Sequence, residues 1–260
     1  MKSGTVAFSI SVVPSFRVSV GVASVARVSR SADLRSFLMV TISENEVFDN
    51  ASSGGRDGGG GIYAYAYDTG NVSILKNRIY SNKSDRHGGG LVAYSCYVEG
   101  NSIYENSADG SGGGIHAIRS LIKNNTITNN SSKRGGGIYA EDSEVNFNAV
   151  IHNRAPSSKG GGMYYYGEGS IQNNSFEGNG TGDTIVVSGN PEIRKNNIIT
   201  ENGFALRVGT QSLASDLDAR GNYWGTNKER MIHFLVYDWL DDSDIGLVDW
   251  KEFSHKPIPD

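Results

Sequence analysis

Five charged or histidine residues stand beside a tripled glycine that recurs along the sequence. They are Arg86, His87, His116, Arg134 and Glu141. A histidine or glutamate can take a proton from the carbon next to a carboxylate, and an arginine can stabilise the negative charge that develops. These residue types suit an elimination reaction on an acidic polymer, so we take the five as candidate catalytic residues. The alternative is that each is charged because it lies at a solvated surface.

Tyrosines follow the same glycines at alternate positions of short strand-like segments. They are Tyr63, Tyr65, Tyr94, Tyr139, Tyr164 and Tyr166. Alternate residues of a strand point to the same side, so these rings are expected to form rows on one outward face. A solvated strand face is usually polar, and rows of rings therefore indicate a platform on which sugar rings stack. The alternative is that tyrosines favour strands and pack on their cross-strand neighbours.

Two motifs give the chain a period. Gly-Gly-Gly followed by an apolar residue starts at positions 59, 88, 112, 135 and 160, which are 29, 24, 23 and 25 residues apart. Asn-x-apolar-x-x-Asn recurs in phase with it, with first asparagines at positions 45, 77, 101, 125, 148, 174, 197 and 222. Because both motifs keep the same period, the chain is expected to be a stack of small equal units rather than a globule.

A unit of about 24 residues with this composition is typical of a parallel β-helix coil. Glycine, asparagine and serine mark the turns, and short strand-like segments such as 138–141 lie between them. Helical repeats are longer, and leucine-rich repeats need leucine at fixed positions. Stacked coils place equivalent residues about 4.8 Å apart, so asparagine side-chain amides can satisfy one another from coil to coil. One inward column is expected to contain Ile62, Leu91, Ile115, Ile138 and Met163.

These motifs give the chain a family resemblance over roughly residues 40–227. It resembles the right-handed parallel β-helix repeat proteins, a superfamily that includes pectate-lyase-like enzymes and many secreted or surface proteins. The closing segment 218–225, Asp-Ala-Arg-Gly-Asn-Tyr-Trp-Gly, is similar to the end of many such helices. The resemblance implies an all-β fold, a right-handed parallel β-helix of about eight coils, and polysaccharide as the partner. It leaves the activity open because this fold hosts many functions.

The catalytic motifs of the resembled enzymes are largely absent. Pectate lyases carry Trp-Ile-Asp-His, and no Asp-His pair occurs here. Polygalacturonases carry an Asp-Asp pair and a His-Gly pair, of which His87-Gly88 matches the second while Asp241-Asp242 lies far along the stack. The Asp-Pro-His motif of alginate-epimerase-like chains is also missing. A polysaccharide lyase or glycoside hydrolase is therefore only one interpretation, and a non-catalytic adhesin-like scaffold is the alternative.

Composition narrows the partners further. The net charge is −4, which argues against a nucleic-acid partner held by a basic face. No apolar run of 18 residues occurs, so no membrane span is expected. The single cysteine, Cys96, lies in a strand-like segment and is expected to be a small buried residue. A secreted or cell-surface location is what the resemblance implies.

The two ends depart from the period. Residues 1–40 are expected to form an irregular N-terminal coil or cap, with a signal peptide as the alternative. Residues 41–227 form the predicted β-helix, and residues 228–260 a cap that begins with a short helix, for which Thr226 or Asn227 is the expected N-cap. Asp241, Asp242 and Asp244 are compatible with a calcium site, although a solvated turn is the favoured interpretation. No other cofactor or metal site is expected.

Overall fold

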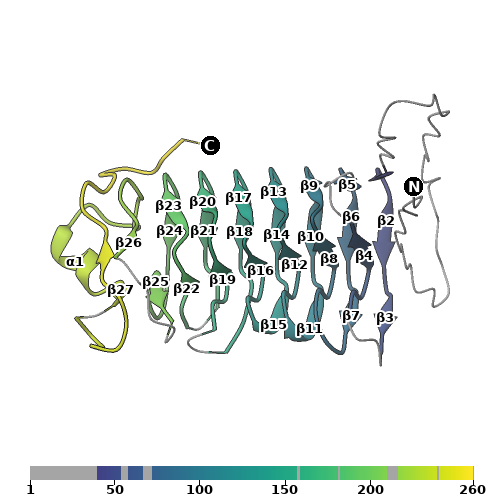
Figure 1. Cartoon of the computed structure of the whole chain (residues 1–260), viewed down its shortest axis with the longest axis horizontal. Coiled ribbons are helices and arrows are strands. Elements are labelled where there is room, and N and C mark those ends of the chain that lie inside the picture. The colour runs from purple at the N-terminus through teal and green to yellow at the C-terminus, as the bar shows by residue number, and fades with distance from the viewer. Residues whose placement is uncertain are drawn as a thin grey trace, which may run out of the picture.

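The chain forms a parallel β-solenoid in the computed structural model (Figure 1). Each coil contributes one strand to each of three long sheets, and the strands of one sheet stack side by side along the rod. The structure describes residues 40–53, 58–66, 72–156, 159–180, 182–209, 216–238 and 240–259. The predicted N-terminal coil or cap and its signal-peptide alternative lie outside the described residues, apart from Val40, which begins the first strand.

The longest sheet has eight strands and carries the segments that follow the tripled glycines. All of its pairings are parallel. Its strands are β4 (Ile62–Tyr65), β8 (Leu91–Tyr94), β12 (Ile115–Ile118), β16 (Ile138–Glu141), β19 (Met163–Gly167), β22 (Ile185–Gly189), β25 (Leu206–Val208) and β27 (Val236–Tyr237). The last of these comes from the region predicted as a cap, so part of that region extends the sheet.

Two further sheets have seven strands each and are joined by a short turn in every coil. The first contains β1 (Val40–Ser43), β5 (Val72–Leu75), β9 (Tyr97–Glu99), β13 (Leu121–Lys123), β17 (Glu144–Asn146), β20 (Ser170–Gln172) and β23 (Glu192–Arg194). The second contains β2 (Glu46–Phe48), β6 (Arg78–Tyr80), β10 (Ser102–Tyr104), β14 (Thr126–Thr128), β18 (Ala149–Ile151), β21 (Ser175–Glu177) and β24 (Asn197–Ile199). The coil count thus differs slightly from the eight expected, and the predicted fold class is confirmed.

Short elements complete the coils and the C-terminal end. A four-stranded sheet contains β3 (Ala51–Ser52), β7 (Lys83–Ser84), β11 (Ser107–Ser111) and β15 (Ser131–Arg134). A two-stranded sheet pairs β26 (Leu217–Asp218) with β28 (Val248–Asp249). The single described helix, α1 (Glu229–His233), begins after Lys228, which occupies the N-cap position without a side-chain cap. Thr226 accepts a hydrogen bond from the Lys228 N–H instead, so neither expected residue is the N-cap.

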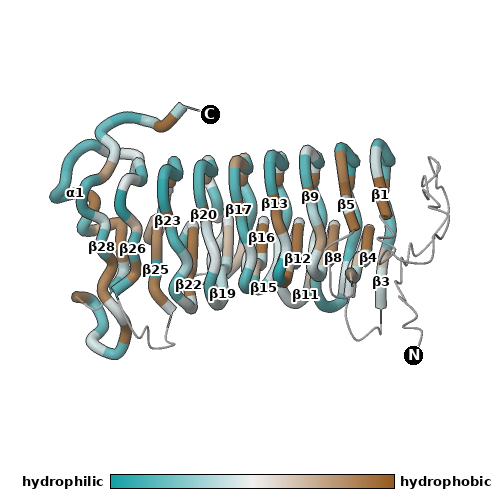
Figure 2. The backbone as a smooth tube through the Cα atoms, turned by 45° about the horizontal axis from the view of Figure 1, so that its top comes forward, coloured by the Kyte–Doolittle hydropathy of each residue, from teal (hydrophilic) through white to brown (hydrophobic). Residues whose placement is uncertain are grey.

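The interior is filled by stacked apolar columns, and Figure 2 shows apolar stretches recurring from coil to coil between mainly hydrophilic turns. The predicted column from Ile62 to Met163 is in register from strand to strand and is buried. Cys96 is also buried, as expected. Burial of such columns stabilises the fold by about 25 cal/mol per Å² of apolar surface removed from water. Because every coil repeats the same layer, the core runs the length of the stack.

Two asparagine ladders hold the turns on either side of the second seven-stranded sheet. In each ladder the side-chain Oδ1 of one asparagine accepts both the backbone N–H and the Nδ2–H of the asparagine in the preceding coil, as Asn125 does for Asn101. The first ladder contains Asn45, Asn77, Asn101, Asn125, Asn148, Asn174, Asn196 and Asn222. The second contains Asn50, Asn82, Asn106, Asn130, Asn153 and Asn179.

The prediction for one repeat of the asparagine motif, starting at Asn197, is wrong by one residue. Asn196, not Asn197, accepts the hydrogen bonds from Asn174, and Ile198, not Ile199, is the fully buried apolar residue. The expected third member, Asn202, is exposed. Asn196 and Asn197 are each followed two residues later by an isoleucine, and the full motif fits only Asn197, so the sequence favours the asparagine whose side chain is not in the ladder.

Two positions of each glycine triplet need glycine for different physical reasons, as Gly112 and Gly113 illustrate. Gly112 adopts a positive φ of 68°, which glycine accepts without strain. A Cβ added to Gly113 would lie 2.3 Å from the carbonyl oxygen of Gly136 in the next coil. The first glycine therefore makes the turn, and the second lets neighbouring coils approach each other.

Candidate functional site

The outward face of the eight-stranded sheet carries two columns of aromatic side chains in strand register. The first column runs Tyr63, Val92, His116, Tyr139, Tyr164, Val186, Arg207 and Tyr237. The second runs Tyr65, Tyr94, Ile118, Glu141, Tyr166 and Ser188. The six tyrosines singled out in the sequence therefore share one face. We call the rings of these columns together with His87 the ring row.

The central rings of the row stack on one another along the rod. The His116 and Tyr139 ring centroids lie 4.7 Å apart with planes 6° from parallel, and those of Tyr139 and Tyr164 lie 5.8 Å apart with planes 3° from parallel. Toward the first coils the contacts are tilted, as between Tyr65 and Tyr94 at 5.3 Å. Parallel stacking means that neighbouring rings cover much of each other's faces. A sugar can reach a ring face only where the stack is interrupted.

Ser111 links the two candidate histidines. Its Oγ lies 2.8 Å from Nδ1 of His87 and 3.1 Å from Nδ1 of His116, and the two imidazole centroids are 4.7 Å apart. A hydroxyl group has one proton, so it donates to one Nδ1 and accepts from the other. When both rings are neutral, one histidine therefore carries its proton on Nδ1 and the other does not. The cluster is a hydrogen-bonded unit that the sequence did not indicate, since Ser111 is five residues from His116.

The surroundings of His116 favour packing over proton transfer. Burial, together with the smaller effect of the nearby His87, lowers the pKa of His116 to about 3. The residue is only 5% exposed, and it lies between two stacked rings. A general base works best with a pKa near the operating pH and within reach of the substrate proton. His116 meets neither condition in this arrangement.

Ser111 also lacks the support that a nucleophile needs. A hydroxyl attacking an acyl group requires backbone donors that stabilise the oxyanion. The adjacent N–H groups of Gly112 and Gly113 donate to the carbonyls of Arg134 and Gly135 in the next coil, at 2.9 and 3.2 Å. The donors next to Ser111 are therefore used by coil stacking.

Of the other three candidate catalytic residues, Arg134 and Glu141 contact rings of the ring row. The Arg134 guanidinium lies over the Tyr164 ring, 5.1 Å from its centroid. A Glu141 carboxylate oxygen accepts a hydrogen bond from the Tyr139 hydroxyl at 3.4 Å. Burial, followed by the charge of Glu141, raises the pKa of Tyr139 to about 12. Arg86 is exposed, and its backbone carbonyl accepts the Gly110 N–H.

The ring row is interrupted after Tyr164, and a pocket lies at the interruption. Val186 replaces an aromatic ring at the next register position, and Arg207 follows it. A pocket of about 240 Å³ is lined here by Lys159, Tyr164, Val186, Arg207, Val208, Gly209, Tyr237, Asp242 and Ile245. Since two coil spacings of about 4.8 Å separate the register positions of Tyr164 and Arg207, the gap is of the right order for one inserted ring. We call this the row-end pocket.

The far wall of the row-end pocket is held rigidly. The Arg207 guanidinium lies 3.8 Å from the centroid of the Tyr237 ring and 4.9 Å from that of Phe204. Arg207 also pairs through Nε with the buried Asp183. Cation–π contact and a partly buried ion pair both fix the orientation of the guanidinium. Sequence reasoning missed Arg207 as a member of a site, because the strand register beyond Tyr164 had not been extended.

A second stacked row on another sheet was also missed. Phe48, Tyr80 and Tyr104 occupy one outward column of the second seven-stranded sheet. Their rings stack at centroid distances of 5.0 and 4.9 Å, and Arg78 lies over Tyr80. The signal was in the sequence, since each follows the apolar residue of an asparagine motif.

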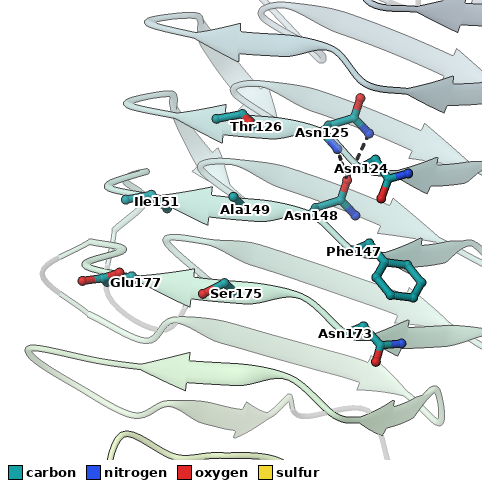
Figure 3. A pocket seen from close by; sticks show the side chains of 10 residues that line it. All are labelled: Asn124, Asn125, Thr126, Phe147, Asn148, Ala149, Ile151, Asn173, Ser175 and Glu177. Carbon is teal, nitrogen blue, oxygen red and sulfur yellow. Dashed lines mark hydrogen bonds between the residues drawn. The ribbon is translucent and has the colours of Figure 1, made fainter. Parts of the chain in front are cut away.

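A groove of about 500 Å³ lies at the turn between the two seven-stranded sheets (Figure 3). Phe147 projects into solvent between Asn124 and Asn173, which occupy equivalent turn positions in the adjoining coils. The groove is lined by Asn124, Asn125, Thr126, Phe147, Asn148, Ala149, Ile151, Asn173, Ser175 and Glu177. None of these residues lines the row-end pocket.

The acidic run near the C-terminus forms a turn in the structure. The Asp241 and Asp242 carboxylates accept the N–H groups of Asp238 and Asp244 at 3.2 and 3.1 Å. Across the described part of the chain, no three histidine, cysteine, aspartate or glutamate side chains gather in a way that could hold a metal ion. A helix long and apolar enough to cross a membrane is likewise not found among the described residues.

Comparison with known proteins agrees with the architecture. Residues 118–236 match a protein-family model described as a right handed beta helix region. Together with the stacked parallel coils, this match supports a right-handed parallel β-helix fold with repeated coils for the chain. Neither a curated protein nor a solved structure matches the chain. The function must therefore be argued from the site itself.

Proposed function

We propose that this chain is an extracellular or surface β-helix protein that binds polysaccharide through the outward face of the eight-stranded sheet. The observation that carries the proposal is the interruption of the ring row, where Tyr164 borders a pocket whose other wall is Arg207 and Tyr237. A pyranose ring presents apolar C–H groups on its faces and hydroxyls at its edge, so an aromatic wall beside polar groups suits it. Lys159, Arg207 and the nearby Arg134 outnumber the carboxylates of Asp242, which lines the pocket, and Asp183, which pairs with Arg207, and this positive excess favours an acidic sugar.

Binding without catalysis is the simpler form of this proposal. A lyase or hydrolase needs a base or acid with a matched pKa close to the bond that breaks. His116 is buried and neutral, Arg134 lies over the Tyr164 ring, and Glu141 accepts the Tyr139 hydroxyl, so these three candidates are held in packing contacts. The stacked rings support a second candidate function, an adhesin-like scaffold in which the row only stiffens the rod. The row-end pocket supports binding instead.

Affinity gel retardation against acidic and neutral polysaccharides tests the proposal, with absorbance of unsaturated products followed in parallel. Tyr164→Ala is expected to weaken retardation by about tenfold. Val186→Tyr continues the row into the pocket and is expected to abolish it. Tyr80→Ala is the matched control, because it removes an equally stacked tyrosine from another sheet. Unchanged retardation in the Tyr164 and Val186 variants would exclude the row-end pocket, and no retardation by any polymer would favour the scaffold. Product formation would identify an enzyme.

A further inference from the structure

Phe147 occupies a backbone conformation that suits it poorly. Its φ is +57°, and the residues at the equivalent turn position of the adjoining coils are Asn124 and Asn173, with φ of +55° each. Asparagine tolerates this left-handed region best, and Glu44, Lys76 and Lys195 adopt it at the same position of other coils, so Phe147 differs from its equivalents in carrying an aromatic ring. The turn itself therefore does not require phenylalanine.

The Phe147 side chain also contributes little to the core. It is 50% exposed, although the buried residues on either side of the turn, Val145 and Asn148, are almost fully covered. A strained and solvent-exposed aromatic residue in the middle of the rod points to a role outside folding. The Lys123 ammonium lies 5.7 Å from the centroid of the Phe147 ring.

The groove around Phe147 offers the remaining parts of a carbohydrate site. The side chains of Asn124 and Asn173 flank the ring, as Figure 3 shows, and their amides can both donate and accept hydrogen bonds. Thr126 and Ser175 add hydroxyl groups to the lining, and Ala149 adds a small apolar surface. A shallow groove with one exposed ring and several neutral polar groups matches the mixed C–H and O–H surface of a sugar.

The charges around the groove favour a neutral ligand. Glu177 is the only charged residue that lines the groove. Lys123 is not part of the lining, but its ammonium lies over the Phe147 ring. The Asn124 amide is held by Glu99, whose carboxylate accepts its Nδ2–H at 3.0 Å. The Glu177 and Glu99 carboxylates are balanced by the Lys123 and Lys76 ammonium groups, so no excess of positive charge favours a polyanion here, whereas neutral hydroxyls can be paired.

We propose that the groove around Phe147 is a second carbohydrate-binding site of this protein, which takes a neutral sugar ring on the Phe147 side chain between Asn124 and Asn173. The site is independent of the row-end pocket, since they share no lining residue. A rod with two such sites can hold two glycan chains, or one chain at two points, and thereby gain avidity.

Methyl NMR titration of the full chain with cellohexaose and mannohexaose tests this site, with polygalacturonate as the acidic comparison. Ala149 and Ile151 report on the groove, and Val186 and Val208 report on the row-end pocket. We expect a neutral hexasaccharide to shift the first pair. Phe147→Gly, which suits the positive φ, should weaken that binding by about tenfold, while Phe147→Trp should retain it.

Tyr164→Ala is the matched control from the other face and should leave the shifts of Ala149 and Ile151 unchanged. Three results would overturn the second site. They are unchanged affinity of Phe147→Gly, absence of groove shifts with both neutral hexasaccharides, and shifts confined to Val186 and Val208. The last result would support the row-end pocket alone, so the two proposals fail separately.

Discussion

The hydroxyl of Tyr165 takes the place of a serine in a third ladder, where it satisfies the backbone of Ser143. Its oxygen accepts the Ser143 N–H at 3.0 Å and lies 2.6 Å from the Ser143 carbonyl oxygen. In the preceding coils the same role falls to serine hydroxyls, as Ser143 accepts the Ser120 N–H and Ser120 accepts the Cys96 N–H. Tyr165 fills an inward position held by alanine in the coils before it.

Tyr165→Phe is expected to destabilise the protein by about 1–3 kcal/mol, because the buried Ser143 N–H would lose its acceptor. Denaturant unfolding measures this difference. Tyr97→Phe is the control, since it removes a hydroxyl bonded to Glu99 at a solvated position, and its effect should stay within about 0.5 kcal/mol. Equal effects of the two changes would contradict the proposed role of the Tyr165 hydroxyl.

Asn125→Ala should be more damaging than Asn45→Ala. The Asn125 Oδ1 accepts two hydrogen bonds from Asn101, whereas Asn45 begins the ladder and accepts none from another coil in the described residues. We expect a loss of at least about 2 kcal/mol for Asn125→Ala, since the buried Asn101 N–H would be left without its acceptor and the Val98 and Lys123 carbonyls would lose the Asn125 Nδ2–H. Chemical denaturation of both variants checks the order, and a larger loss at Asn45 would contradict the ladder.

Gly113→Ala should destabilise the stack by about 3 kcal/mol, because the new methyl group would press on the backbone of the next coil. Gly100→Ala is the control. Its Cβ would meet no atom closer than 3.5 Å, so only the strain of its positive φ remains, which costs about 1 kcal/mol. Thermal unfolding separates the two. If Gly100→Ala proved the more harmful, close coil approach would not explain the second glycine.

Stability should fall as the pH drops from about 6.5 toward 3, because His116 has a pKa of about 3 in the folded protein. In that window the unfolded chain binds a proton that the folded chain does not, so His116 contributes a slope of up to about 1.4 kcal/mol per pH unit. His116→Phe keeps a stacked ring and should flatten the profile between pH 7 and 5. If stability fell equally steeply with pH in the variant, titrating groups other than His116 would dominate the pH dependence.

Asp218 changes the stability of the protein at a lower pH than the range from 7 to 5 in which His116 is tested. Hydrogen bonds from Arg220 lower the pKa of the Asp218 carboxyl to about 2. Its contribution is therefore complete above the ordinary pKa near 3.8 and is lost only as the pH falls from there toward 2.

Phe147→Gly should raise stability by about 1 kcal/mol, because glycine adopts the positive φ of this turn without strain. Differential scanning calorimetry measures the change. Phe147→Ala keeps the strained backbone and should give no such gain. A loss of stability with glycine would show that the exposed ring supports the fold.

The sequence by itself determined the coil, the period and most of the residues that face inward. Glycine and asparagine at fixed spacing specify where turns fall, and the alternating columns follow from the two-residue period of a strand. The positions of the six tyrosines on one face followed from the same register. These features are local and repeat in every coil, so the residue pattern of one coil predicts the structure of the next.

Tertiary structure decided the features that depend on what lies beside each column. The sequence favoured Asn197 over Asn196 for the ladder, and it could not show that rings in register would cover one another's faces. The row-end pocket exists because Val186 and Arg207 break the row across coils, and Ser111 meets His87 from the neighbouring coil. Such contacts join residues more than 20 positions apart, and their geometry is fixed only when the coils stack.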